Sequence, residues 1–155
     1  MLNLSCAQGA LGPRIPPLAE REMTSADAAS RKAIVMVMGS RRSRPLLEAL
    51  DKAGVRPALE QSMPKALAAL EQNRVAAVVV DRARVDVDAL EFVLNVRDVD
   101  SRLPVLIVGR SDDRKSDATL AAQNGTHLVD EPDSYDTSVV PAVMRILEMS
   151  GTECR

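Results

Sequence analysis

From residue 32 onward, short apolar runs alternate with stretches in which apolar residues recur at helical spacing. The third and fourth runs are rich in Val and Ile with almost no polar interruption, as in strands buried on both faces of a parallel sheet. The second and fifth runs give a weaker strand signal. The five runs span residues 33–38, 55–59, 75–80, 104–108 and 127–129.

The stretches between and after these runs carry helix signals. Pro64 suits a first helical turn, Gly54 and Gly125 suit helix ends, and either Asp86 or Asp88 suits the cap of the third helix. Apolar positions recur at helical spacing within residues 46–53, 66–70, 90–96, 119–122 and 139–147.

Strand and helix therefore alternate five times, which predicts a doubly wound α/β sandwich with a five-stranded parallel sheet. The usual strand order for five such units is 2-1-3-4-5, the flavodoxin-like arrangement. We assign this domain to residues 32–150. Residues 1–31 contain prolines, glycines and scattered charges without periodicity, which predicts a flexible tail, and residues 151–155 form a short C-terminal tail.

Composition excludes many functions. The formal charge is −2, from 20 basic and 22 acidic residues, so there is no bulk attraction to nucleic acid or to a membrane surface. Phe92 and Tyr135 are the only aromatic residues, which argues against sites built on stacking. A single histidine, His127, leaves no usual zinc or haem ligand set and no visible nucleophile–base pair, so we expect no enzyme.

Two features suggest a cytoplasmic protein. Cys6 and Cys154 lie at opposite ends of the chain and do not form a disulfide framework, which favours a reducing compartment. No apolar run approaches the roughly 20 residues needed to span a bilayer.

In a sheet of this kind, chemistry takes place outside the carboxyl ends of the strands. The third strand ends at Asp81, and Asp88-Ala-Leu-Glu-Phe follows seven residues later. The fourth strand reads Leu103-Pro-Val-Leu-Ile-Val, and Pro132 follows the fifth. In this order and spacing, residues 32–150 resemble the receiver domain of two-component response regulators. The resemblance implies that Asp81 occupies the phospho-acceptor position and that the peptide before Pro132 is cis, as it commonly is in the family.

The remaining receiver chemistry is missing. The resemblance implies acidic residues after the first strand that help to hold Mg²⁺, but the sequence there is Met38-Gly39-Ser40. The hydroxyl residue at the end of the fourth strand is replaced by Gly109, and the lysine before Pro132 is replaced by Glu131. We therefore expect a degenerate receiver, or pseudo-receiver, with no cofactor and a lost Mg²⁺ site.

Without these cations, a phosphoryl group on Asp81 would face the like charge of Glu131, which opposes ordinary phosphotransfer. Arginines gather in the loops that follow the strands, and three interpretations stay open for them. They are solvated charges paired locally with Asp86, Asp112 and Asp113, or one guanidinium bridges Asp81 and Glu131 in place of the metal, or the rim binds an anion or nucleotide. The arginines are Arg41, Arg42, Arg44, Arg82, Arg84, Arg110 and Arg114.

The leading hypothesis is a phosphorylation-independent receiver-like module that acts by protein–protein interaction, without a DNA-binding or catalytic output domain. The alternatives are a single-domain response regulator phosphorylated on Asp81 by a histidine kinase, and a pseudo-receiver that senses an anion or nucleotide. The resemblance implies a partner surface on the fourth helix, fifth strand and fifth helix, for a kinase, a regulator or a second copy in a homodimer. Its candidate contact residues are Leu120, Leu128, Val139, Val143 and the neighbours of Leu147.

Overall fold

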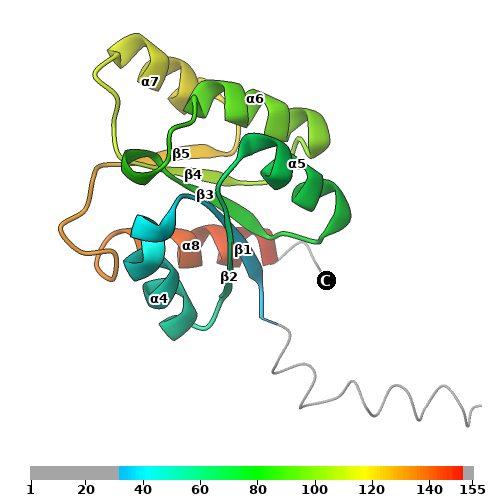
Figure 1. Cartoon of the computed structure of the whole chain (residues 1–155), viewed down its shortest axis with the longest axis vertical. Helices are drawn as coiled ribbons and strands as arrows, with labels where there is room; N and C mark the ends of the chain where they lie inside the picture. Colours follow the sequence, from blue (N-terminus) through cyan, green and yellow to red (C-terminus); the bar gives the residue numbers. More distant parts are fainter. Residues whose placement is uncertain (1–31, 152–155) are drawn as a thin grey trace, which may run out of the picture. The chain divides into compact units, whose positions relative to one another are not determined.

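The computed structural model describes residues 32–151 (Figure 1). The predicted tail at 1–31, residues 152–155 and both cysteines lie outside the described residues. In chain order the elements are β1 (Ile34–Met38), η2 (Arg41–Ser43), α4 (Arg44–Lys52), β2 (Arg56–Glu60), α5 (Met63–Gln72), β3 (Ala77–Asp81), η3 (Arg82–Arg84), α6 (Ala89–Val99), β4 (Val105–Val108), α7 (Arg114–Ala122), β5 (Thr126–Val129) and α8 (Val139–Gly151).

The five strands form one parallel sheet in the order β2-β1-β3-β4-β5, which confirms the predicted fold class and strand order. The register places Asp81 opposite Val108, and Val108 opposite Val129. The carboxyl ends of β3, β4 and β5 therefore meet at one edge of the sheet. The loops that follow these three strands start side by side.

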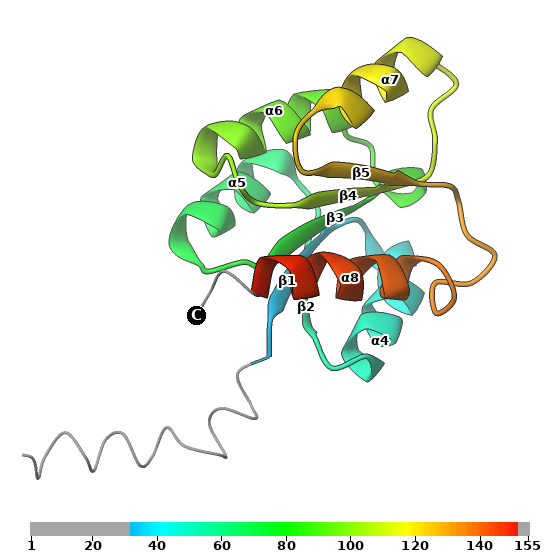
Figure 2. The same ribbon diagram turned by 180° about the vertical axis from the view of Figure 1, so that it is seen from behind.

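Helices cover both faces of the sheet, with α4 and α8 on one face and α5, α6 and α7 on the other (Figures 1 and 2). Alternate residues of each strand feed the two resulting core layers. Val35 and Val37 of β1 pack in the layer with α4 and α8, whereas Met36 and Met38 pack in the layer with α5, α6 and α7. Both faces of the inner strands are thus buried, as their uninterrupted apolar sequences predict.

The helix starts follow local side-chain chemistry. Asp88, not Asp86, caps α6 by accepting a hydrogen bond from the Glu91 N–H at 3.0 Å. Pro64 lies in the first turn of α5, as expected.

Helix α8 ends at Gly151, one residue beyond the predicted domain boundary. None of the helices within residues 32–151 is long and apolar enough to cross a membrane.

Three of the predicted partner-contact residues prove to be core residues. Leu120, Val139 and Val143 are fully or almost fully buried, so they cannot contact another protein in this fold. Their helical spacing is the same for an inward-facing and an outward-facing stripe, and here it marks the inward face. The predicted partner surface can still include α7, β5 and α8, but these three side chains are not part of it.

A contact between α6 and the start of β5 shows how the sheet edge is held. Arg97 of α6 donates hydrogen bonds to the Leu103 carbonyl, at 2.5 Å, and to Thr126 Oγ1, at 3.1 Å. Gly125 has φ +73°, and a β-carbon there would lie 3.2 Å from Arg97 Nη2. Gly54 has φ +95° with no atom within 4 Å of such a β-carbon.

These two glycines make a matched pair for a stability measurement. Gly54→Ala introduces backbone strain alone, and we expect it to lower the free energy of unfolding by about 1 kcal/mol. Gly125→Ala adds pressure on the hydrogen-bonded Arg97, and we expect a loss of about 2 kcal/mol. Urea unfolding of both variants tests the difference. Equal losses would show that Arg97 yields freely at this position.

Candidate functional site

The candidate site lies at the edge of the sheet where β3 ends. Asp81 is the last residue of β3 and its exposed fraction is 0%. An ionised carboxylate at such a position needs a cation or hydrogen-bond donors, because burial without them is strongly unfavourable. The surrounding residues show which group provides this compensation.

Arg84 provides the compensating charge. The three residues after Asp81 form the 3-10 turn η3, in which side chains three positions apart lie on the same side, so Arg84 returns over Asp81. Its Nη1 atom lies 3.3 Å from Asp81 Oδ1 and 2.9 Å from Glu131 Oε1. The hydrogen bond with Glu131, helped by the charge of Asp81, raises the pKa of Arg84 above its ordinary value. A single guanidinium therefore bridges the two carboxylates.

Tyr135, in the loop between β5 and α8, completes this side of the site. The Arg84 guanidinium carbon lies 5.7 Å from the centre of the tyrosine ring, within cation–π range. Burial, with the charge of Asp81, raises the pKa of the Tyr135 hydroxyl. Two buried oxygens of the site, Asp81 Oδ2 and Tyr135 Oη, have no hydrogen-bond partner within the described residues.

The segment that follows β1 contains serines where the receiver resemblance implies carboxylates. Ser43 is fully buried, and its Oγ accepts a hydrogen bond from the Ser40 N–H at 3.1 Å. A β-carbon at position 39 would lie 2.3 Å from that Oγ, so only glycine fits there without a shift of the loop. Met38 is buried in the core, and Arg41 and Arg42 are exposed on η2. Among the described residues, neither of these two arginines forms an ion pair.

These residues do not fit the Mg²⁺ ion that the receiver resemblance implies. The position after β1 offers Gly39 and Ser40, and a guanidinium lies against Asp81. Within residues 32–151, no group of three or more His, Cys, Asp or Glu side chains is arranged to hold a metal ion. The loss of Mg²⁺ binding stays a prediction, and this donor set supports it.

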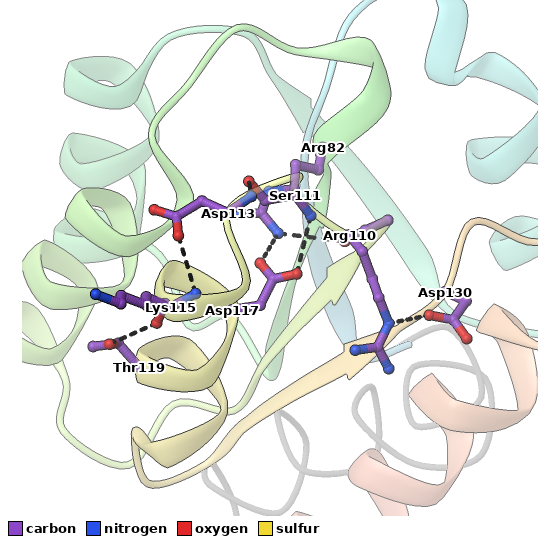
Figure 3. A network of polar contacts seen from close by, with 9 residues as sticks. Arg82, Arg110, Ser111, Asp113, Lys115, Asp117, Thr119 and Asp130 are labelled. Atoms are coloured by element: carbon purple, nitrogen blue, oxygen red, sulfur yellow. Dashed lines mark hydrogen bonds and ion pairs between the residues drawn. The ribbon is translucent and has the colours of Figure 1, made fainter.

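A second ion pair lies beside the first. Arg82 Nη1 lies 2.7 Å from Asp117 Oδ1, and Asp117 Oδ2 accepts a hydrogen bond from the Ser111 N–H at 3.0 Å (Figure 3). Burial by itself would raise the pKa of Asp117, but the Ser111 and Arg82 hydrogen bonds outweigh it and lower the pKa from its ordinary value.

Gly109, at the end of β4, has φ +97°, and a β-carbon there would lie 3.4 Å from Glu131 Oε2.

The predicted local ion pairs with Asp86, Asp112 and Asp113 do not form among the described residues. Arg110 pairs with Asp130 across the loops after β4 and β5, on the exposed surface (Figure 3). The bridging guanidinium is present at Arg84, whereas Arg41, Arg42 and Arg110 are exposed, as the interpretation of solvated charges expects. Binding of an anion by the arginines stays a prediction.

Three site features differ from the sequence-based expectations or were missed by them. The peptide before Pro132 is trans, like every other peptide bond within residues 32–151, so the expected cis bond is wrong. Tyr135 and Asp117 were not predicted as site residues. The only usable signal was for Tyr135, the single tyrosine of the chain, four residues after Glu131.

No protein-family model matches the sequence, and no curated protein matches it. Solved structures do. The signal receiver domain of an HD-domain protein from Pseudomonas fluorescens has a TM-score of 0.67 and 15% identity, over 79% of this chain and 99% of that one. A chemotaxis response regulator of Vibrio cholerae has a TM-score of 0.62 and 19% identity, over 74% of this chain and 98% of that one. The beryllofluoride-activated NtrC receiver domain has a TM-score of 0.61 and 23% identity, over 77% of this chain and 97% of that one. The described chain therefore has the fold of response-regulator receiver domains.

The Asp117 contacts predict a pH-dependent contribution to stability. A carboxylate whose pKa is lowered in the folded state stabilises the fold above its unfolded pKa of about 4, and this stabilisation is lost as the pH falls through the folded pKa. We expect Asp117→Asn to lower the free energy of unfolding by about 1–2 kcal/mol at pH 7, and the difference from wild type to shrink toward pH 3. Urea unfolding across this range measures both.

Asp112→Asn is the matched control, because Asp112 is exposed and forms no hydrogen bond or ion pair among the described residues. Its effect should be within about 0.5 kcal/mol at both pH values. A loss for Asp117→Asn that is independent of pH would contradict an ionised, stabilising Asp117.

Proposed function

We propose that this chain is a receiver-like signalling module whose carboxylate site is held in one state by Arg84 and is not switched by phosphorylation. The observation that carries the proposal is the position of Arg84 Nη1, 3.3 Å from Asp81 Oδ1 and 2.9 Å from Glu131 Oε1. The receiver fold supplies the context, and the bridging guanidinium supplies the difference from a phosphorylated receiver.

Formation of an acyl phosphate on Asp81 requires one of its oxygens to attack phosphorus in line with the leaving group, and requires the added negative charge to be neutralised. Asp81 Oδ1 already accepts a hydrogen bond from Arg84. A phosphoryl group would also approach Glu131, whose carboxylate shares the same guanidinium. The hydrogen bond from Arg84 and the negative charge of Glu131 both oppose phosphorylation. Neither Gly39 nor Ser40 supplies a carboxylate that could bind a compensating metal ion.

With no catalytic chemistry assigned, the output of the proposed module is contact with another protein. The face formed by α7, β5 and α8 remains the proposed surface, for a kinase, a regulator or a second copy, in the cytoplasm. Its outward side chains are polar or small, apart from Met149 with an exposed fraction of 62%. They include Arg114, Lys115, Ala118, Ala121, His127, Arg145 and Met149.

One observation favours the alternative of a phosphorylated single-domain response regulator. Asp81 Oδ2 has no hydrogen-bond partner within the described residues, so one oxygen of the acceptor carboxylate is unoccupied by protein groups. Displacement of Arg84 by a kinase complex would then be needed for transfer. The two functions differ in their response to phosphoryl donors and analogues.

We expect the wild-type protein not to respond to beryllofluoride with Mg²⁺ or to acetyl phosphate. Amide NMR spectra should show no saturable shifts with either Mg²⁺ alone or beryllofluoride with Mg²⁺, and intact mass should not change with acetyl phosphate. The physical reason is that Arg84 holds Asp81 while Glu131 repels added negative charge. Asp81→Asn is the control, with the acceptor oxygen removed and the side-chain shape kept.

A saturable shift or a mass increase that Asp81→Asn abolishes would replace the proposal with the phosphorylated alternative. Arg84→Ala gives a further distinction. We expect this variant also not to respond, because the missing carboxylates after β1 are not restored. A response gained in Arg84→Ala alone would show that the guanidinium is the main barrier to phosphorylation.

A further inference from the structure

We propose that the η3 turn links the Asp81 site to helix α7, with Arg84 as its arm toward the site and Arg82 as its arm toward the helix. This inference rests on the proposed function, because it gives the locked site a route to the proposed partner surface. Both arms leave one 3-10 turn of three residues that directly follows β3.

The arm toward α7 is largely shielded from solvent. The side chains of Arg82 and Asp117 are 15% and 9% exposed, and their charged atoms lie 2.7 Å apart. The Asp117 carboxylate also accepts a hydrogen bond from the Ser111 N–H. It therefore connects η3, the loop after β4 and the first turn of α7 (Figure 3). An ion pair this sheltered has a defined geometry, unlike the exposed pair of Arg110 and Asp130.

Gly109 lies between the two arms. Its carbonyl lies 3.5 Å from Arg82 Nη1, and a β-carbon at this position would lie 3.7 Å from Arg82 Cβ and 3.4 Å from Glu131 Oε2. The end of β4 therefore runs in close contact with η3 on one side and with the carboxylate held by Arg84 on the other. A displacement of η3 would change the contact between Arg82 Nη1 and the Gly109 carbonyl, because this backbone adjoins the turn.

The two ion pairs are consequently predicted to be energetically coupled. Release of Arg84 from Asp81 and Glu131 frees η3 to move, and this movement alters the position from which Arg82 reaches Asp117. The N-terminal turn of α7, part of the proposed partner surface, then loses its fixed position. Coupling of this kind is reciprocal, so a partner that moves α7 would also alter the Asp81 site.

The chain contains a reporter for each end of this link. Tyr135 is its only tyrosine, tryptophan is absent, and its ring stacks near Arg84, so tyrosine fluorescence reports on the Asp81 site alone. The Ser111 amide donates to Asp117, so its hydrogen-exchange rate reports on the α7 end. Neither reporter contacts the residue that is substituted at the opposite end.

The experiment substitutes each end and observes the other in the full chain. We expect Arg84→Gln to raise the exchange rate of the Ser111 amide about fivefold or more, and Asp117→Asn to change the Tyr135 fluorescence in the same direction as Arg84→Gln. Arg44→Gln is the control, since it removes an exposed ion pair with Glu48 on α4, away from both Asp81 and Asp117. It should leave Ser111 exchange within about twofold of wild type. If Arg84→Gln fails to fold, Glu131→Gln, which removes one charge from the same bridge, takes its place with a smaller effect in the same direction.

Unchanged Tyr135 fluorescence in Asp117→Asn, or Ser111 exchange in Arg84→Gln no faster than in Arg44→Gln, would overturn the link. Neither result would affect the proposed function, which depends on the response to phosphoryl analogues. Conversely, a saturable beryllofluoride response would overturn the proposed function and leave the measured coupling in place. The two failures are therefore distinguishable.

Discussion

The site depends on the need to neutralise one carboxylate that is completely shielded from solvent. Asp81 sits at the end of the central strand β3 with no exposure, and an uncompensated charge there would cost several kcal/mol. Arg84 neutralises it because the 3-10 turn brings the side chain three residues later back over the strand end. The receiver resemblance implies a lysine at position 131. Here the cation comes from the loop after β3 and the carboxylate from the loop after β5, so the charge reversal at Glu131 is matched by Arg84.

Two glycines support the predicted loss of receiver side chains, because the surrounding packing disfavours a side chain at either position. At position 39, Ser43 Oγ occupies the place where a β-carbon would lie. At position 109, φ +97° disfavours any side chain, and the Glu131 carboxylate is close to where one would start. A single substitution toward the family pattern at either position would therefore meet a backbone and neighbours already arranged for glycine.

The alternation of apolar runs was sufficient to predict the fold class and to place Asp81 at a strand end, and the strand order followed from the arrangement that is usual for five such units. The sequence could not select Arg84 from the seven arginines in the loops, since only the turn conformation decides which side chain returns to the strand. It could not find the Arg82–Asp117 pair either, because its members lie 35 positions apart and Asp112 and Asp113 were nearer to other arginines. For Leu120, Val139 and Val143, helical spacing identified a stripe but not the direction it faces.

A guanidinium that belongs to the chain differs physically from a bound ion or a phosphoryl group. Its local concentration is fixed by the η3 turn, so the state of the proposed site does not vary with the supply of Mg²⁺ or of a phosphate donor. A signal would then have to enter by another route. Because Arg82 and Arg84 share one turn, the proposed route is through α7, where a partner's binding energy can act on Asp117 and so on the bridge itself. In such a protein the partner would be both the input and the output of the module.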